Sequence, residues 1–161
     1  MDESQLRIDG WRTGIHFDAA HLIPHHPKCG RLHGHTYALH VVVHGRIGGN
    51  GFILDFGDVK KALKAIADRL DHHVLIQGKS PEFTAEEAKD GVRFAVGGKH
   101  YHIPYPDALV LPLEYTSAEH LAAYVADELV RAIPWPAEVT RLDVGVDESY
   151  GKGAWAIRTL H

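Results

Sequence analysis

Residues 33–47 read HGHTYALHVVVHGRI, and this stretch decides the fold. Successive side chains of a β-strand point to opposite faces of its sheet. On that alternation one face is mostly apolar, whereas the other is mostly polar and carries Thr36, His40, His44 and Arg46. The apolar face holds His33, His35, Tyr37, Leu39, Val41, Val43 and Ile47. The pattern predicts a long strand with one buried face, and it predicts a solvated position for His40 and His44.

The segment before it, Trp11–His21, also alternates, with Phe17, Ala19 and His21 on one side. A connection that contains proline and glycine, Leu22–Leu32, separates the two segments. We predict two strands that pair as a hairpin. In that arrangement His21 comes beside His33 and His35.

Two segments have the apolar spacing of an amphipathic helix. Apolar residues recur at three- and four-residue intervals from Val59 to Leu70, and either Asp55 or Asp58 can cap this helix. It should end near the sequence Asp71-His72-His73. The second helix follows Thr116–Glu119, which has the pattern of a capping box.

The segment Gln77–Leu113 is less regular, and alternation around the Gly97-Gly98 turn signal predicts an inserted hairpin. Two strands, Val139–Glu148 and Ala154–Leu160, close the chain. The fold class is therefore α+β, an antiparallel four-stranded sheet with two helices on one face plus the inserted hairpin. We expect one domain over 1–161, with an insertion at about 77–113.

The composition of the chain excludes several classes of function. The 161 residues include 45% apolar and 24% charged residues, as in a globular domain, and the formal net charge of −4 gives no basic surplus for nucleic acid. One cysteine excludes an internal disulfide and favours a reducing, cytoplasmic location. No apolar stretch is long enough to cross a membrane, and no signal peptide is evident at the N-terminus.

Histidine is concentrated in one region, since eight of the 14 histidines lie between His16 and His44. His33 and His35 share a strand face, and His21 can join them across the hairpin. Three neutral imidazoles suit a divalent ion such as Zn²⁺ and leave a fourth position open for water or substrate. Strand histidines that simply bond to their neighbours are the alternative.

Cys29 lies four residues before His33 and has three possible roles. It can be a fourth metal ligand that closes the site, a thiolate base beside the cation, or an inert buried thiol.

Two carboxylates are candidates for substrate chemistry. Asp71 can orient the imidazole of His72 as a proton shuttle, although a histidine at a helix end is often only a partner of the helix dipole. Glu148 ends an apolar strand row and can accept two parallel N–H groups of a guanidine-like ring edge, or it can simply reach water.

Five motifs together resemble the family of 6-pyruvoyltetrahydropterin synthases and 6-carboxytetrahydropterin synthases. They span most of the chain in the expected order, at Phe17–His21, Cys29–His35, Leu70–His73, Thr116–Glu119 and Val146–Ser149. The resemblance implies the tunnelling fold. It also implies a homohexamer made of two trimers, with active sites at subunit interfaces.

The resemblance also implies site roles. It makes His21, His33 and His35 zinc ligands and Cys29 a catalytic base rather than a ligand. Asp71 with His72 becomes the second proton-transfer pair, and Glu148 becomes the anchor of a small-molecule pterin. Lys28 and Arg31 are candidate partners of the triphosphate.

The implied substrate is 7,8-dihydroneopterin triphosphate. The three-residue gap between Cys29 and His33 resembles the 6-carboxy branch, which releases acetaldehyde and triphosphate and serves 7-deazaguanine and queuosine biosynthesis. The alternatives are a 6-pyruvoyltetrahydropterin synthase, a dihydroneopterin aldolase, and a metal-binding module without catalysis. The long Gln77–Leu113 insertion departs from the simplest bacterial members of the 6-carboxy branch.

Overall fold

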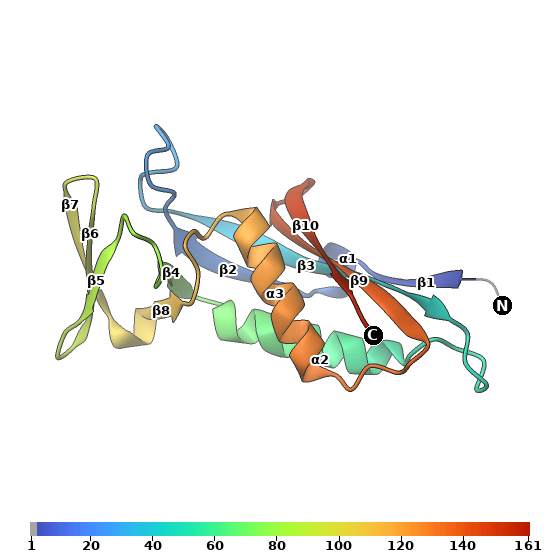
Figure 1. Cartoon of the computed structure of the whole chain (residues 1–161). Helices are drawn as coiled ribbons and strands as arrows, with labels where there is room; N and C mark the ends of the chain where they lie inside the picture. Colours follow the sequence, from blue (N-terminus) through green and yellow to red (C-terminus); the bar gives the residue numbers. More distant parts are fainter. Residues whose placement is uncertain (1–2) are drawn as a thin grey trace.

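A computed structural model describes residues 3–161 as one large sheet, two long helices and a small second sheet (Figure 1). The large sheet has seven strands in the order β10-β9-β3-β2-β4-β8, with β1 also paired to β3. Its strands are β1 (Glu3–Ile8), β2 (His16–His21), β3 (His33–Arg46), β4 (His73–Gln77), β8 (Ala108–Leu111), β9 (Val139–Ser149) and β10 (Lys152–Thr159).

The four strands expected from sequence, β2, β3, β9 and β10, are antiparallel neighbours. This confirms the α+β class and the four-stranded core of the sheet. The sheet extends further than expected, because β4 runs parallel to β2, and β8 runs parallel to β4. The sheet is therefore mixed.

The expectation of one continuous strand over Trp11–His21 is wrong at its start. Residues Gly10–Thr13 form the short helix α1, in which the Asp9 carboxylate accepts hydrogen bonds from two backbone N–H groups. Gly14 ends the helix with a left-handed φ of 71°. This turn allows β1 and β2 to pair with successive parts of the same edge of β3.

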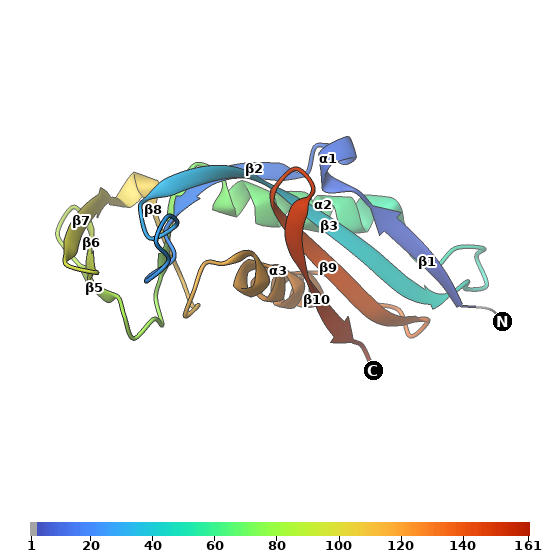
Figure 2. The same ribbon diagram turned by 90° about the horizontal axis from the view of Figure 1, so that it is seen from above.

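The helices α2 (Phe56–Leu70) and α3 (Ala118–Ala132) cover one face of the sheet (Figure 2). They pack on Phe17, Tyr37 and Leu39, so the apolar face of β3 lies in the main core as expected. Asp55, not Asp58, caps α2. The expected capping box at 116–119 is not formed, since the N-cap of α3 is Ser117 and its side chain bonds to no backbone N–H. No helix within residues 3–161 is long and apolar enough to span a bilayer.

His40 and His44 correct the expectation of a solvated face. His40 is only 8% exposed, and its Nε2 lies 3.2 Å from Asp147 Oδ2. His44 Nε2 lies 2.9 Å from Asp143 Oδ2. Acidic side chains of β9 therefore face both histidines on the side of the sheet away from the helices.

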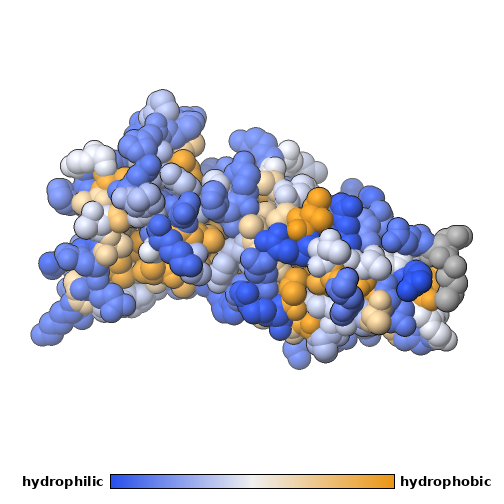
Figure 3. Space-filling model, viewed as in Figure 1, coloured by the Kyte–Doolittle hydropathy of each residue, from blue (hydrophilic) through white to orange (hydrophobic). Residues whose placement is uncertain are grey.

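The segment 77–113 adds a small antiparallel sheet of β5 (Thr84–Glu87), β6 (Gly91–Val96) and β7 (Lys99–Pro104), followed by the 3₁₀ turn η1 (Tyr105–Asp107). The expected hairpin is β6–β7, and both turn glycines have positive φ, 56° and 74°. A second apolar cluster joins this sheet to the rest of the chain, with Phe83 stacked on Phe94. Apolar surface gathers at this end of the molecule (Figure 3).

Candidate active site

Three histidines converge at the end of the β2–β3 hairpin, on the face that carries the helices. The register places His21 directly opposite His33, as the sequence predicts, and His35 follows two residues along the same face. Their ring centroids lie 4.8 to 5.3 Å apart. One nitrogen of each ring lies within 4.8 Å of the other two.

Backbone carbonyl groups determine which ring nitrogen of His21 and His33 carries the proton. His21 Nδ1 lies 2.9 Å from the Thr116 carbonyl oxygen, and His33 Nδ1 lies 2.6 Å from that of Arg31. A carbonyl oxygen only accepts hydrogen bonds, so each Nδ1 carries the proton and each Nε2 keeps its lone pair. The Nε2 atoms of all three histidines are buried without a hydrogen-bond partner. Buried unpaired nitrogens with free lone pairs fit a metal cation.

Glu148 reaches this cluster from the end of β9. Its Oε1 lies 3.1 Å from His21 Nε2 and 3.5 Å from His35 Nε2, off the direction of a hydrogen bond. Where His21 Nε2 carries a proton in place of a metal ion, its contact lowers the pKa of Glu148, and burial opposes this shift. Burial lowers the pKa of His35, so the neutral form that binds metals is favoured there.

Cys29 lies in the loop between β2 and β3 and is partly exposed. Its backbone N–H donates to His26 Nδ1 at 2.9 Å, and its carbonyl accepts from Ile23 N at 2.7 Å. The close group of three ligand nitrogens does not include its sulfur. The structure therefore does not place Cys29 as a fourth ligand.

Asp71 and His72 lie together just before β4. His72 Nδ1 is 2.8 Å from Asp71 Oδ2, and the other Asp71 oxygen accepts the Asp18 backbone N–H at 2.8 Å. Burial opposes the shift, but hydrogen bonds from Asp18 and His72 lower the pKa of Asp71. His72 itself has a left-handed φ of 57° and donates its backbone N–H to the Asp18 carbonyl.

Asp18 is the residue of this cluster that the sequence analysis missed. Its carboxylate accepts a hydrogen bond from the Thr36 hydroxyl and lies within 4.8 Å of the Asp71 and His72 ligand atoms. Asp18 belongs to the Phe17–His21 motif, but it lies three residues before His21 in β2, so its side chain points to the opposite face of the sheet. The three histidines lie on the helix face, whereas the Asp71–His72 pair gathers around Asp18 on the other face.

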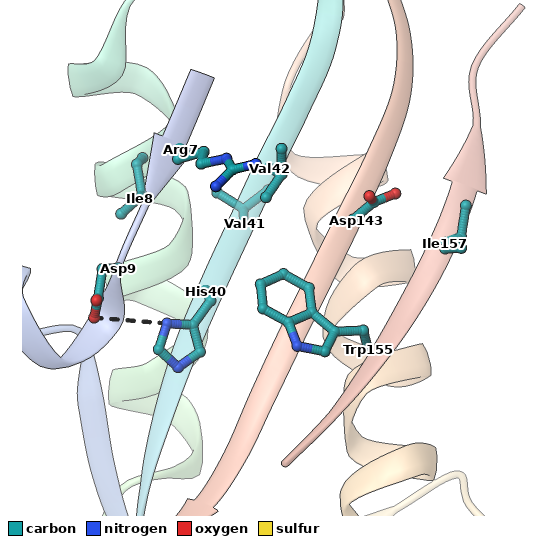
Figure 4. Close-up of a pocket in the computed structure, with 9 residues that line it drawn as sticks. All are labelled: Arg7, Ile8, Asp9, His40, Val41, Val42, Asp143, Trp155 and Ile157. Atoms are coloured by element: carbon teal, nitrogen blue, oxygen red, sulfur yellow. Dashed lines mark ion pairs between the residues drawn. The ribbon is translucent and has the colours of Figure 1, made fainter. Parts of the chain in front are cut away.

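A hollow of about 610 Å³ lies beside this second cluster, and its lining includes Asp18 and His72 and also His35 of the histidine cluster. A second hollow of about 430 Å³ lies further along the same side of the sheet (Figure 4). Its lining includes His40 and Trp155 and none of the predicted site residues.

The mixed sheet, the helices on one face and the convergent imidazoles define an α+β protein of the tunnelling-fold class with a potential metal centre. The family model described as 6-pyruvoyl tetrahydropterin synthase matches residues 11–158, and the chain belongs to that family.

Relatives of this chain carry more than one activity name. A putative 6-carboxy-5,6,7,8-tetrahydropterin synthase of Methanocaldococcus jannaschii is 35% identical over 153 residues, which cover 92% of this chain and 93% of that protein. A dihydroneopterin monophosphate aldolase of Pyrococcus furiosus is 42% identical over 59 residues, or 37% of this chain and 50% of that one. The crystal structure of 6-pyruvoyltetrahydropterin synthase from Plasmodium vivax is 25% identical with a TM-score of 0.92, covering 99% of this chain and 100% of that one.

Proposed function

We propose that this protein is a zinc-dependent 6-carboxy-5,6,7,8-tetrahydropterin synthase. It would convert 7,8-dihydroneopterin triphosphate to 6-carboxytetrahydropterin, acetaldehyde and triphosphate in the cytoplasm, for 7-deazaguanine and queuosine biosynthesis. The observation that carries the proposal is the set of three buried, unpartnered Nε2 atoms in a chain of this family. The Methanocaldococcus jannaschii relative, similar over nearly its whole length, supports the choice of the 6-carboxy branch.

His21, His33 and His35 are the proposed zinc ligands. The carbonyl contacts of His21 and His33 hold their rings so that Nε2 faces the site. When bound, zinc supplies Lewis acidity, which polarises the side-chain oxygens of the substrate and acidifies adjacent C–H and O–H bonds.

The proposed proton-transfer groups are Cys29 and His72. Asp71 accepts a hydrogen bond from the Nδ1–H group of His72, which leaves Nε2 to take or give a proton. Glu148 is the proposed anchor of the pterin, since a carboxylate can accept two parallel N–H bonds from the 2-amino group and the neighbouring ring nitrogen.

The separation of the two clusters supports an assembly. In one chain the rings of the histidine cluster and the Asp71–His72 pair lie on opposite faces of the sheet, which separates the proton-transfer pair from the three Nε2 atoms. We propose a homohexamer of two trimers, in which a neighbouring copy brings His72 to the metal centre.

Mixing two inactive variants tests the shared site. His33→Ala lacks a metal ligand, and His72→Ala lacks the proton-transfer group, so each alone should be nearly inactive. Hexamers reassembled from both should regain a clear fraction of wild-type turnover, because some sites then combine two intact halves. Reassembled mixtures that stay as inactive as the single variants would argue against shared sites.

Product analysis tests the reaction. Mass spectrometry of the zinc-loaded protein with dihydroneopterin triphosphate should show 6-carboxytetrahydropterin, with acetaldehyde released in equal amount. A 6-pyruvoyl product without acetaldehyde would indicate the pyruvoyl synthase. Glycolaldehyde from dihydroneopterin or its monophosphate would indicate an aldolase, the second candidate, which the Pyrococcus furiosus relative favours. Zinc binding without turnover of any of these would leave only a metal-binding module.

A further inference from the structure

The loop that carries Cys29, residues 22–32, rests against the inserted segment 77–113. At its start, Leu22 is 2% exposed and packs in the second apolar cluster with Phe83 and Phe94. The Leu22 carbonyl also accepts a hydrogen bond from Gln77 Nε2 at 3.0 Å. The inserted segment therefore holds the first residue of this loop, which we name the Cys29 loop.

The middle of the Cys29 loop meets an acidic side chain of the insertion. His25 Nε2 lies 3.1 Å from Glu82 Oε2. The second oxygen of Glu82 accepts the Tyr115 hydroxyl at 3.3 Å, whereas Oε2 is near His25 without forming a hydrogen bond. His25 has a left-handed φ of 63°, which turns the loop at this contact.

The end of the Cys29 loop meets Lys99, the first residue of β7. Lys99 Nζ donates a hydrogen bond to the carbonyl oxygen of Gly30, the residue after Cys29. The same ammonium lies 5.8 Å from the ring centre of Tyr101, and Tyr101 stacks on Phe94 at 4.8 Å. Lys99 therefore projects from a packed hairpin and not from a free strand end.

Hydrogen bonds inside the loop couple the backbone of Gly30 to that of Cys29 through His26. Gly30 N donates to the His26 carbonyl at 2.9 Å, and the Cys29 N–H donates to the ring of the same histidine. A Cβ on Gly30 would lie 2.7 Å from that carbonyl, so the loop closes too tightly for a side chain there. Fixing the Gly30 carbonyl thus restricts the backbone of Cys29.

We propose that the inserted segment positions the Cys29 loop and that Lys99 is the positioning residue for the thiol. The effect on turnover rests on the function proposed above, whereas the effect on the loop does not. A base acts only within hydrogen-bond reach of the proton it removes, so a loop released at Gly30 would hold the thiol in place for less of the time.

Cys29 is the only cysteine, so the rate of its alkylation by iodoacetamide reports on this loop alone. In the zinc-loaded protein at constant pH, Lys99→Met should raise that rate about five-fold, as expected when a charge-assisted hydrogen bond of ordinary strength is lost. The turnover number should fall by a similar factor, with KM and zinc content little changed. Lys99→Arg can still donate to the carbonyl and should restore both values.

The matched control is Lys89→Met, which removes an exposed lysine from the turn between β5 and β6. It should leave alkylation and turnover at the wild-type values. An alkylation rate in Lys99→Met equal to that of Lys89→Met overturns the proposal, whatever the activity. Absence of product from the wild-type protein would instead reject the proposed reaction, because alkylation requires no substrate.

Discussion

At the scale of single residues, Asp143 shows how the outer face of the sheet is stabilised. Its carboxylate accepts hydrogen bonds from Arg141 Nε at 2.6 Å and Nη2 at 3.0 Å, and it lies 2.9 Å from His44 Nε2. Burial opposes the shift, but the bonds from Arg141 and His44 lower the pKa of Asp143. A carboxyl whose pKa is lower in the folded state stabilises the fold above its unfolded pKa. That stability is lost as pH falls through the folded pKa.

Asp143→Asn should therefore lower the free energy of unfolding most at pH 6 to 7, by roughly 1 kcal/mol for a partly exposed ion pair. The difference from the wild type should shrink as pH falls below the ordinary range of an aspartate carboxyl and on through the lowered pKa of folded Asp143. Urea denaturation at several pH values measures this. Glu86→Gln, at an exposed position of β5, is the control and should change little. A difference that stays constant from pH 7 to pH 3 would show that charge is not the cause.

Sequence could predict the histidine cluster but not the surroundings of His40 and His44. Two-residue alternation places His33 and His35 on one face, and the hairpin brings His21 to them, so local rules suffice. The environment of His40 and His44 depends on Asp147 and Asp143, about a hundred residues later, and on the strand register that faces them. The sequence did not reveal Asp18 because its partners Asp71 and His72 lie just before β4, which pairs with β2 only in the folded chain.

At the scale of elements, the two long helices begin differently. Asp55 Oδ1 accepts the Gly57 N–H at 2.7 Å, whereas the Ser117 hydroxyl lies 3.0 Å from His120 Nδ1 and satisfies no backbone N–H. Asp55→Ala should lower the free energy of unfolding by about 1 kcal/mol, and Ser117→Ala by only about 0.3 kcal/mol. Chemical denaturation of both variants measures the contrast. Equal losses would mean that the Asp55 cap contributes no more than the Ser117 side chain.

Gly145 in β9 gives the large indole of Trp155 room to lie across the strand. A Cβ at Gly145 would lie 2.8 Å from the ring of Trp155. Glycine is normally unfavourable inside a strand, yet Gly145→Ala should destabilise the protein by about 1 kcal/mol, because it forces the half-exposed ring of Trp155 aside. Gly49→Ala, where an added Cβ meets nothing within 4 Å, is the matched control. A neutral or stabilising effect of Gly145→Ala would contradict the packing argument.

Long elements were predictable and short ones were not. The strands β2, β3, β9 and β10 and both long helices have enough periodic residues to show their pattern. The strands β4 and β8 have five and four residues and pair in parallel with distant segments. The helix α1 depends on one aspartate cap and one left-handed glycine, which interrupt an alternating pattern that favours a strand.

At the scale of the whole molecule, the chain has two apolar clusters, and each joins different parts of the structure. The larger one joins the sheet to α2 and α3, and the smaller one joins the inserted sheet to Leu22 at the start of the Cys29 loop. The small sheet lies at one end of the molecule, away from the β9–β10 strands (Figure 2). Alternation around the Gly97-Gly98 turn signal predicted an inserted hairpin there, but only the folded chain shows that the insertion touches the loop of the predicted catalytic cysteine.

Metal binding should couple to the stability of the whole fold. The proposed ligands come from β2 and β3 at the centre of the sheet, and an ion bound only by the folded state stabilises it. With free zinc at about 100 times the dissociation constant, the gain is about 2.7 kcal/mol, or a rise in Tm of roughly 5–10 °C for a domain of this size. A chelator should reverse the rise. Protons compete with zinc for the imidazole nitrogens, so the rise should also shrink as the pH is lowered.

His33→Ala should abolish most of the zinc-dependent rise in Tm, because two imidazoles bind a divalent ion much more weakly than three. His100→Ala, at an exposed position of β7, should keep the full rise. Calorimetry of the three proteins with and without zinc separates the proposed centre from adventitious binding by the other histidines of this histidine-rich chain. If His33→Ala and the wild type gained equally, the stabilising zinc would sit elsewhere, and the convergence of the three Nε2 atoms would need another explanation.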